Sequence, residues 1–223
     1  NIPANVWQRI GANLHQRPDH PIGILKNLVE NVIRGRTADK FEIYDDFSPV
    51  CSVKGCFDDL LTPKDHVSRS TSDTFYVDAE NVLRTHATAH QSDLLRQGKR
   101  AVLWTSDVYR KDEIDRFHYP VFHQTDGIRV WSNDELEAMR VASGFSTTEE
   151  VVVNDLKKTL ELIARELFGA DRAIGWDETA YFPFTHPSIE LEVDFDELAE
   201  TRAVVVAHSP RVAKGLEDRI GLQ

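Results

Sequence analysis

Six polar residues that could bind a charged ligand stand close together near the middle of the chain: Arg110, Asp112, His118, His123, Gln124 and Asp126. An apolar run at residues 101–110 predicts a strand before the cluster, and residues 127–132 predict a second strand after it. The pattern therefore predicts a hairpin that displays charge at one end. Burying an arginine beside histidines and carboxylates costs free energy unless a ligand or partner completes the pairing. A polar ligand site and a solvated loop both remain open at this point.

The elements around this hairpin are predicted from local signals. Pro21 suits the first turn of a helix that Asp19 or His20 precedes, and Gly35 is expected to end it. A long helix is expected after Thr147 or Thr148, because acidic residues follow in its positive first turn. Short β-like runs complete the pattern, at residues 41–44, 50–53, 73–76, 82–84, 189–193 and 201–207. The predicted fold class is α+β, an antiparallel sheet flanked by helices.

Length and composition bound the possibilities. At 223 residues the chain fits a single domain, which we expect to span residues 1–223. Its formal net charge of −11 argues against a broad nucleic-acid surface, because phosphate binding needs lysine and arginine in excess. No apolar run reaches the roughly 18 residues that a membrane span needs. No metal site is predicted, since Cys51 and Cys56 make a zinc tetrad only if histidines such as His66 join them.

Three longer segments carry a resemblance to a known family. YRKDEID at residues 109–115, with FHQ at residues 122–124, closely resembles motif 2 of the class II aminoacyl-tRNA synthetases in its phenylalanyl-tRNA synthetase form. RTHATAHQ at residues 84–91 resembles the segment before that motif. YFPFTHPS at residues 181–188 is similar to the substrate-binding strand of the mitochondrial single-chain version. The resemblance implies the class II fold and a mitochondrial location.

The resemblance also implies a nucleotide site. Arg110 would contact the α-phosphate of ATP, and Asp112 would face adenine. His118 would contact the phosphates, so that Arg110 and His118 are the expected catalytic residues. A guanidinium with its fixed fork suits this task, because the site must hold two anions together. ATP with Mg²⁺ is the cofactor set expected if the site functions.

The same resemblance implies a phenylalanine site. His86 and Thr88 would meet the α-amino group and the carboxylate, and Gln124 and Asp126 would bind the amino group from the other side. Asp126 replaces the usual glutamate of the family, which withdraws the carboxylate by one methylene. Two aromatic side chains would contact the substrate ring edge-on, Phe182 and Phe184.

Later segments depart from the family pattern. Two glycines that leave room for the phenyl ring in the family are replaced by Ala203 and Val205, with Val204 between them. Added methylenes in a packed pocket cost about 1 to 3 kcal/mol. The sequence reaches Gln223 without the GxGxxR segment of motif 3, whose arginine holds the γ-phosphate. We therefore expect a core that is incomplete at its C-terminal end and has no anticodon-binding domain.

Two functions remain open on this basis. The first is a non-catalytic, structural or accessory subunit of a larger mitochondrial assembly, in which a nucleotide still binds weakly but no phenylalanyl-adenylate forms. The second is the catalytic core of an active phenylalanine–tRNA ligase, which would also bind tRNA. Partner subunits or a second copy would cover residues 201–212 or the helix that begins at Pro21, and a ribonucleoprotein setting fits the first function. That helix corresponds to motif 1, although a core-facing role explains its apolar stripe equally well.

Overall fold

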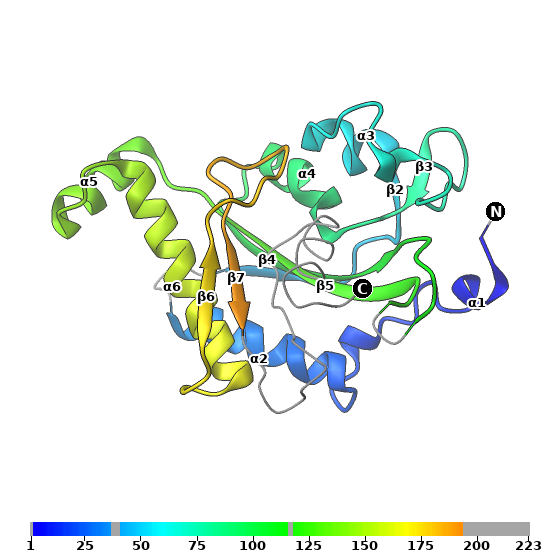
Figure 1. Ribbon diagram of the computed structural model, residues 1–223, viewed down its shortest axis with the longest axis horizontal. Coiled ribbons are helices and arrows are strands. Elements are labelled where there is room, and N and C mark those ends of the chain that lie inside the picture. The colour runs from blue at the N-terminus through cyan, green and yellow to red at the C-terminus, as the bar shows by residue number, and fades with distance from the viewer. Residues whose placement is uncertain (1, 37–40, 116–117, 194–223) are drawn as a thin grey trace. The chain divides into compact units, whose positions relative to one another are not determined.

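The computed structural model describes residues 2–36, 41–115 and 118–193 (Figure 1). The chain divides into two compact units, Asn1–Val130 and Trp131–Gln223, each with its own sheet and core. A single domain over residues 1–223 stays a prediction. The strand expected at residues 201–207, the substitutions at Ala203, Val204 and Val205, and the partner surface expected at residues 201–212 lie outside the described residues.

An antiparallel hairpin forms the centre of the first unit, with strands β4 (Ala101–Tyr109) and β5 (Val121–Arg129). The prediction of a strand at residues 101–110 is confirmed. The prediction that the second strand starts at residue 127 is wrong, because β5 begins at Val121. Three of the polar residues expected in a loop therefore lie on the strand: His123, Gln124 and Asp126. Backbone pairing with β4 holds this polar strand in the sheet, although its side chains show no hydrophobic alternation.

A short strand, β1 (Glu42–Tyr44), pairs with β4 in parallel and completes a three-stranded sheet in the order β1-β4-β5. A separate antiparallel pair consists of β2 (Val50–Ser52) and β3 (Asn81–Leu83). The strand predicted at residues 73–76 is wrong apart from one bridge between Tyr76 and Val82. Its first residues form a turn instead, since the backbone N–H groups of Asp73 and Thr74 both donate to the carbonyl of Ser70.

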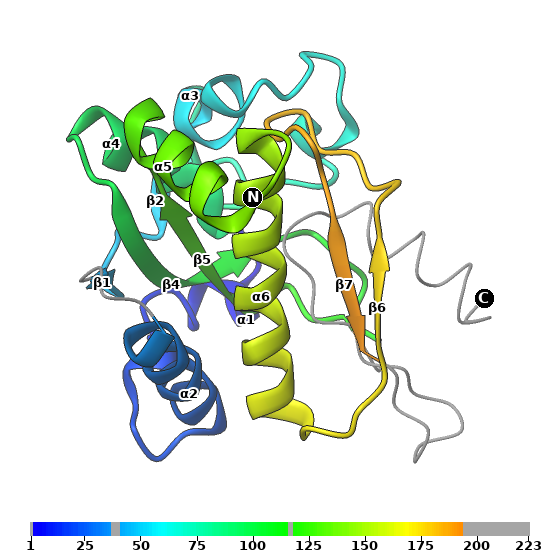
Figure 2. The same cartoon turned by 90° about the vertical axis from the view of Figure 1, so that its left-hand side faces the viewer.

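The hairpin has two differently covered faces, as the two views of the first unit show (Figures 1 and 2). Helix α2 (Pro21–Arg36) lies along one face. The other face packs against the 3₁₀ helix η4 (Ala87–His90), where the indole nitrogen of Trp104 donates to the carbonyl of Ala87 at 2.9 Å. Side chains alternate between the faces along each strand. Residues paired across the hairpin share a face, so Ser106 and Gln124 point one way, while Asp107 and His123 point the other.

The remaining short elements of the first unit surround this hairpin: α1 (Ala4–Trp7), η1 (Leu14–Gln16), α3 (Val53–Cys56), η2 (Asp58–Leu60), η3 (Val67–Arg69) and α4 (Gln91–Arg96). Buried apolar residues of these segments form the core beside the sheet. Val6, Phe75, Leu83 and Tyr109 make one cluster, and Cys56 and Phe57 lie in a second.

Helix α2 begins as predicted and ends one residue later than predicted. The Nδ1 atom of His20 accepts a hydrogen bond from the backbone N–H of Ile22 at 3.2 Å, which caps the first turn. The helix continues through Gly35 to Arg36, so Gly35 does not end it. Gly23 is buried against the preceding turn, because a Cβ atom there would lie only 2.0 Å from the carbonyl oxygen of Arg17. A larger residue at position 23 would force the helix away from the turn.

In its described residues, 131–193, the second unit contains two helices, α5 (Asn133–Ser143) and α6 (Thr148–Phe168), and one antiparallel strand pair, β6 (Ile174–Asp177) with β7 (Glu190–Val193). The start predicted for α6 is confirmed: Thr147 and Glu150 form a capping box. β7 agrees with the strand predicted at residues 189–193, whereas β6 was not predicted. Leu191, Val193 and Ala164 form the core between the strands and α6.

Candidate active site

Arg110 stands directly after β4 and is held by two contacts. Its Nε atom donates to the carbonyl of Thr85 at 2.8 Å, and its guanidinium carbon lies 4.9 Å from the centre of the Phe122 ring. Burial lowers the pKa of the Arg110 guanidinium, and the carboxylate of Asp112 acts in the opposite direction. Arginine stays protonated under such shifts. In the described part of the chain its two terminal nitrogens have no hydrogen-bond partner, so they are available to an anion.

The segment 85–87 connects Arg110 to Gln124. While the Thr85 carbonyl accepts from Arg110, the backbone N–H of Ala87 donates to Oε1 of Gln124 at 3.1 Å. His86 lies between these two anchor points and meets the Phe57 ring edge-on at 6.5 Å. Three residues that the sequence separates widely are therefore brought together.

Two buried polar atoms on this side of the hairpin have no hydrogen-bond partner among residues 2–36, 41–115 and 118–193. They are Nδ1 of His86 and Oγ of Ser106. Ser106 pairs with Gln124 across the hairpin and was not predicted as a site residue. Unpaired buried polar groups cost free energy, so such atoms are commonly found where a ligand or water binds. Only the register of the hairpin, which the sequence did not reveal, marks Ser106 as a neighbour of Gln124.

Two further residues expected to bind phenylalanine lie on different elements, Thr88 in η4 and Asp126 on β5. Thr88 is buried within η4, in the same turn as the Ala87 anchor. Asp126 pairs with Trp104 across the hairpin, and its carboxylate accepts a hydrogen bond from the N–H of Gly127 at 2.9 Å. The phenylalanine-binding roles of these residues stay predictions.

The loop after β4 carries the other residues expected at a nucleotide. Asp112 is exposed. His118 is held by Asp115, whose carboxylate lies 2.8 Å from Nδ1 of the imidazole and accepts from the backbone N–H of His118 at 2.7 Å. Asp115 thus fixes the orientation of His118, a role that sequence reasoning missed. The nucleotide-binding roles of Arg110, Asp112 and His118 stay predictions.

Phe182 and Phe184 belong to the second unit. Phe182 is buried, and the centres of the two rings lie 6.3 Å apart at an interplanar angle of 30°. The hydroxyl of Ser188 accepts from the backbone N–H of Phe182 at 3.2 Å and is 2.6 Å from the hydroxyl of Thr185. These bonds fix the loop that presents the aromatic pair.

Arg84 was not singled out from the sequence, yet it organises the first unit. It is 1% exposed, forms an ion pair with Asp107, and donates to the carbonyls of Phe47 and Ser48 at 3.0 Å each. The second carboxylate oxygen of Asp107 accepts from the hydroxyl of Tyr109. A buried arginine that is paired in this way fixes β3 and β4 relative to each other.

Two kinds of feature are absent from the described part of the chain. No three His, Cys, Asp or Glu side chains there lie together in a way that could hold a metal ion. No helix in that part is long and apolar enough to cross a membrane.

The fold and this site define a class of protein. The chain matches the family described as tRNA synthetases class II core domain (F) over residues 10–207, and it belongs to that family. A solved structure, pyrrolysyl-tRNA synthetase from Desulfitobacterium hafniense, aligns with 87% of this chain and 64% of its own, with a TM-score of 0.53 and 12% sequence identity. That likeness concerns the fold alone, and it confirms the predicted α+β, class II-like architecture.

Two relatives share a much larger fraction of identical residues with this chain than the solved structure does. The chloroplastic/mitochondrial phenylalanine–tRNA ligase of Arabidopsis thaliana is 48% identical over 88% of this chain and 44% of its own length. The mitochondrial phenylalanine–tRNA ligase of Mus musculus is 38% identical over 99% of this chain and 54% of its own. The chain therefore spans about half the length of these relatives. Both names include the mitochondrion, in agreement with the location expected from the sequence.

Proposed function

We propose that this chain is part of the catalytic core of a mitochondrial phenylalanine–tRNA ligase, which activates phenylalanine with ATP before its transfer to tRNA. The observation that carries the proposal is the segment 85–87. It holds Arg110 through the Thr85 carbonyl and Gln124 through the Ala87 N–H, with His86 between them. A phosphate-binding cation and amide and imidazole groups suited to an amino acid thus share one side of the hairpin.

The proposed reaction assigns a task to each group. One oxygen of the phenylalanine carboxylate bonds to the α-phosphorus of ATP, and the bond from that phosphorus to the β-phosphate oxygen breaks. The electron pair of that bond leaves on pyrophosphate. Charge accumulates on the α-phosphate oxygens, where the terminal nitrogens of Arg110 can donate hydrogen bonds. Magnesium is expected to accompany ATP, where it would neutralise part of the phosphate charge.

Gln124 and Ser106 are positioned to form hydrogen bonds with a bound ligand. Gln124 is fixed by its bond to Ala87, so its NH₂ group can donate to a ligand without a large loss of side-chain entropy. The unpartnered hydroxyl of Ser106 lies opposite in the register. Asp126, two residues along the same face of β5, supplies the carboxylate expected to meet the α-amino group.

A second candidate function is a non-catalytic subunit of a larger assembly. The observation that favours it is the sequence at residues 203–205, where alanine and two valines replace the small residues of the family pattern. Larger side chains at the floor of the pocket that accommodates the phenyl ring would exclude phenylalanine and leave nucleotide binding intact.

Phenylalanine-dependent exchange of pyrophosphate into ATP separates the two candidates. We expect the full chain to catalyse the exchange and an Arg110→Ala change to lower its rate about 100-fold or more. Arg34→Gln is the matched control, because this exposed arginine of α2 lies outside the site and should leave the rate unchanged. A folded chain without exchange, whose activity appears only after Ala203→Gly with Val205→Gly, would support the second candidate.

A further inference from the structure

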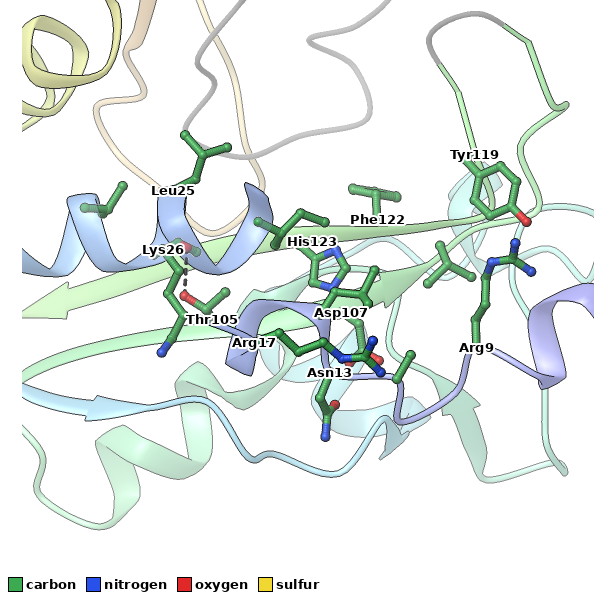
Figure 3. Close-up of a pocket in the computed structure, with 16 residues that line it drawn as sticks. Arg9, Asn13, Arg17, Leu25, Lys26, Thr105, Asp107, Tyr119, Phe122 and His123 are labelled. Atoms are coloured by element: carbon green, nitrogen blue, oxygen red, sulfur yellow. Dashed lines mark hydrogen bonds between the residues drawn. The ribbon is translucent and has the colours of Figure 1, made fainter. Parts of the chain in front are cut away.

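The face of the hairpin opposite Gln124 and Ser106 borders a cavity of about 700 Å³. Helix α2 forms one wall, the turn before it forms a second, and the side chains of β4 and β5 form the floor (Figure 3). Pockets for small ligands commonly have volumes of about 300 to 1,000 Å³. The size of this cavity therefore suits a small molecule, and no role in the proposed reaction explains it.

The wall that α2 contributes is apolar. Ile22, Leu25 and Val29 recur at helical spacing along this wall, with Val121 on the strand side. Leu25 lines the cavity and is 48% exposed, so its apolar surface is in contact with water. An apolar body placed in the cavity would remove this surface from water, at roughly 25 cal/mol per Å².

The charged side chains around the cavity have partners among the described residues, with one exception. Lys26 is paired with Glu30 at 3.1 Å and with Asp45 at 2.7 Å. Asp107, the only carboxylate among the described residues of the lining, is paired with Arg84 and accepts a hydrogen bond from Tyr109.

Arg17 is the exception. It lines the cavity and is exposed, and its guanidinium has no hydrogen-bond or ion-pair partner within residues 2–36, 41–115 and 118–193. Arg9, the remaining arginine of the lining, donates to the carbonyl of Asn5 at 2.8 Å and stacks over the Tyr119 ring at 5.1 Å. The charge left over at the cavity is therefore positive, and Arg17 is the cation able to meet an anion.

The floor adds hydrogen-bonding groups without charge. Burial, followed by the proximity of His15, lowers the pKa of His123 to about 4, so its imidazole is neutral at pH 7. Its Nδ1 atom is buried without a hydrogen-bond partner in the described part of the chain. The hydroxyls of Thr105 and Thr125 lie 2.8 Å apart and bond to each other, which leaves one of their two hydrogens for a ligand.

We propose that this cavity binds a small monocarboxylic acid with an apolar body, whose carboxylate meets Arg17 and whose body packs against the α2 wall. An amino acid is a poorer ligand, because its ammonium group would find no unpaired carboxylate in the lining. A neutral amide is also poorer, because it forgoes the charge-assisted bonds to the guanidinium. The cavity lies on the face of the hairpin opposite Gln124 and Ser106, although Phe122, the ring beneath Arg110, also belongs to its lining.

The test uses three probes of nearly equal size on the full chain: 3-phenylpropionate, its amide and phenylalanine. Calorimetric titration should show binding of 3-phenylpropionate, with a Kd at least 10-fold lower than that of the amide. Arg17→Gln should raise this Kd about 10-fold or more, and Leu25→Trp should abolish binding by filling the cavity. Arg34→Gln, on the same helix but outside the lining, should leave it unchanged.

Arg110→Ala distinguishes this cavity from the phenylalanine site. Binding of 3-phenylpropionate should survive Arg110→Ala and fail in Arg17→Gln. The proposal is overturned if the acid does not bind, if acid and amide bind equally, or if Arg110→Ala removes binding while Arg17→Gln does not. Circular dichroism verifies the fold of each variant, and because Arg17 is exposed, its result decides even if Leu25→Trp does not fold.

Discussion

Arg84 directly follows β3 and Arg110 directly follows β4, and the two arginines meet different surroundings. Arg84 is 1% exposed and donates hydrogen bonds to the carboxylate and carbonyl of Asp107, to two further carbonyls and to His90. Arg110 donates one bond to Thr85 and stacks on Phe122. The number of donors that the protein itself satisfies is what differs between the two.

This difference separates a structural arginine from a binding one. A guanidinium whose three nitrogens all have partners within the protein has little left to offer a ligand, and it holds the chain segments that surround it. A guanidinium fixed by one nitrogen and one ring face keeps its orientation while its remaining donors stay available. Loss of Arg84 should therefore affect folding, whereas loss of Arg110 should affect binding and catalysis.

The largest expected effect is on stability at Arg84. Arg84→Met leaves the Asp107 carboxylate buried without its cation, and this should lower the free energy of unfolding by about 3 to 5 kcal/mol. Urea denaturation measures the change. The double variant Arg84→Met with Asp107→Leu should recover part of the loss, because no charge is then left unpaired. If Arg84→Met alone lowered the free energy of unfolding by less than about 1 kcal/mol, Arg84 would not have the structural role that distinguishes it from Arg110.

The next effect concerns pH and His90. Nε2 of His90 lies 3.0 Å from Nη1 of Arg84, and since arginine can only donate, this imidazole is an acceptor and is neutral. Burial, then the charge of Arg84, lowers the pKa of His90 to about 4. Its unfolded pKa is about 6.5, so the unfolded state binds the proton more readily.

Stability should therefore fall as the pH decreases from about 6.5 to 4, with a share on the order of 2 kcal/mol from this histidine. His123, whose pKa is also lowered to about 4, adds to the same window. Chemical denaturation at several pH values would show the loss. His90→Gln, which keeps an acceptor but cannot titrate, should remove the share of His90; an unchanged pH dependence would contradict this account.

A smaller effect is expected on stability at Arg110. Arg110→Met removes one hydrogen bond to a carbonyl and the guanidinium that stacks on Phe122, so it should cost about 1 kcal/mol. The same urea denaturation measures it beside Arg84→Met. A loss as large as that of Arg84→Met would show that both arginines are structural.

The smallest effect concerns the ring beneath Arg110. Phe122→Leu keeps an apolar surface but removes the aromatic face, which should weaken ATP binding by about 0.5 to 1 kcal/mol, or roughly threefold in Kd. Titration with ATP measures this. Val121→Ala, at the next position on the opposite face, is the control and should leave the Kd for ATP unchanged.

The sequence predicted those parts of the fold that local signals determine. The strand at residues 101–110 and the capped start of α6 are confirmed because an apolar run and an N-cap followed by glutamates act over a few residues. The start of β5 was missed because polar residues lie on both of its faces. Its pairing with β4 is a long-range property.

The site also combines features that the sequence predicts with features that depend on long-range contacts. Arg110, His86 and Gln124 were named through the motifs that they match, and the structure brings them together through the segment 85–87. Arg84 belongs to one of those motifs, yet its burial and its ion pair with Asp107 depend on contacts between residues 23 positions apart. Ser106 could be found only from the register of the hairpin. The residue types indicated the chemistry of the site, whereas the contact partners of each residue could be identified only from the folded structure.

The absence of a side chain at Gly23 has a consequence for the distance across the cavity. A methyl group there would meet the Arg17 carbonyl oxygen at 2.0 Å, so the helix or the turn would have to move by about an ångström. Arg17 stands on one side of this contact, and Leu25 follows two residues along the helix on the other. Gly23 therefore allows the helix and the turn to lie in direct contact. A single added carbon at this position would change the distance between Arg17 and the apolar wall of α2, although Arg17 and the wall residues themselves would be unchanged.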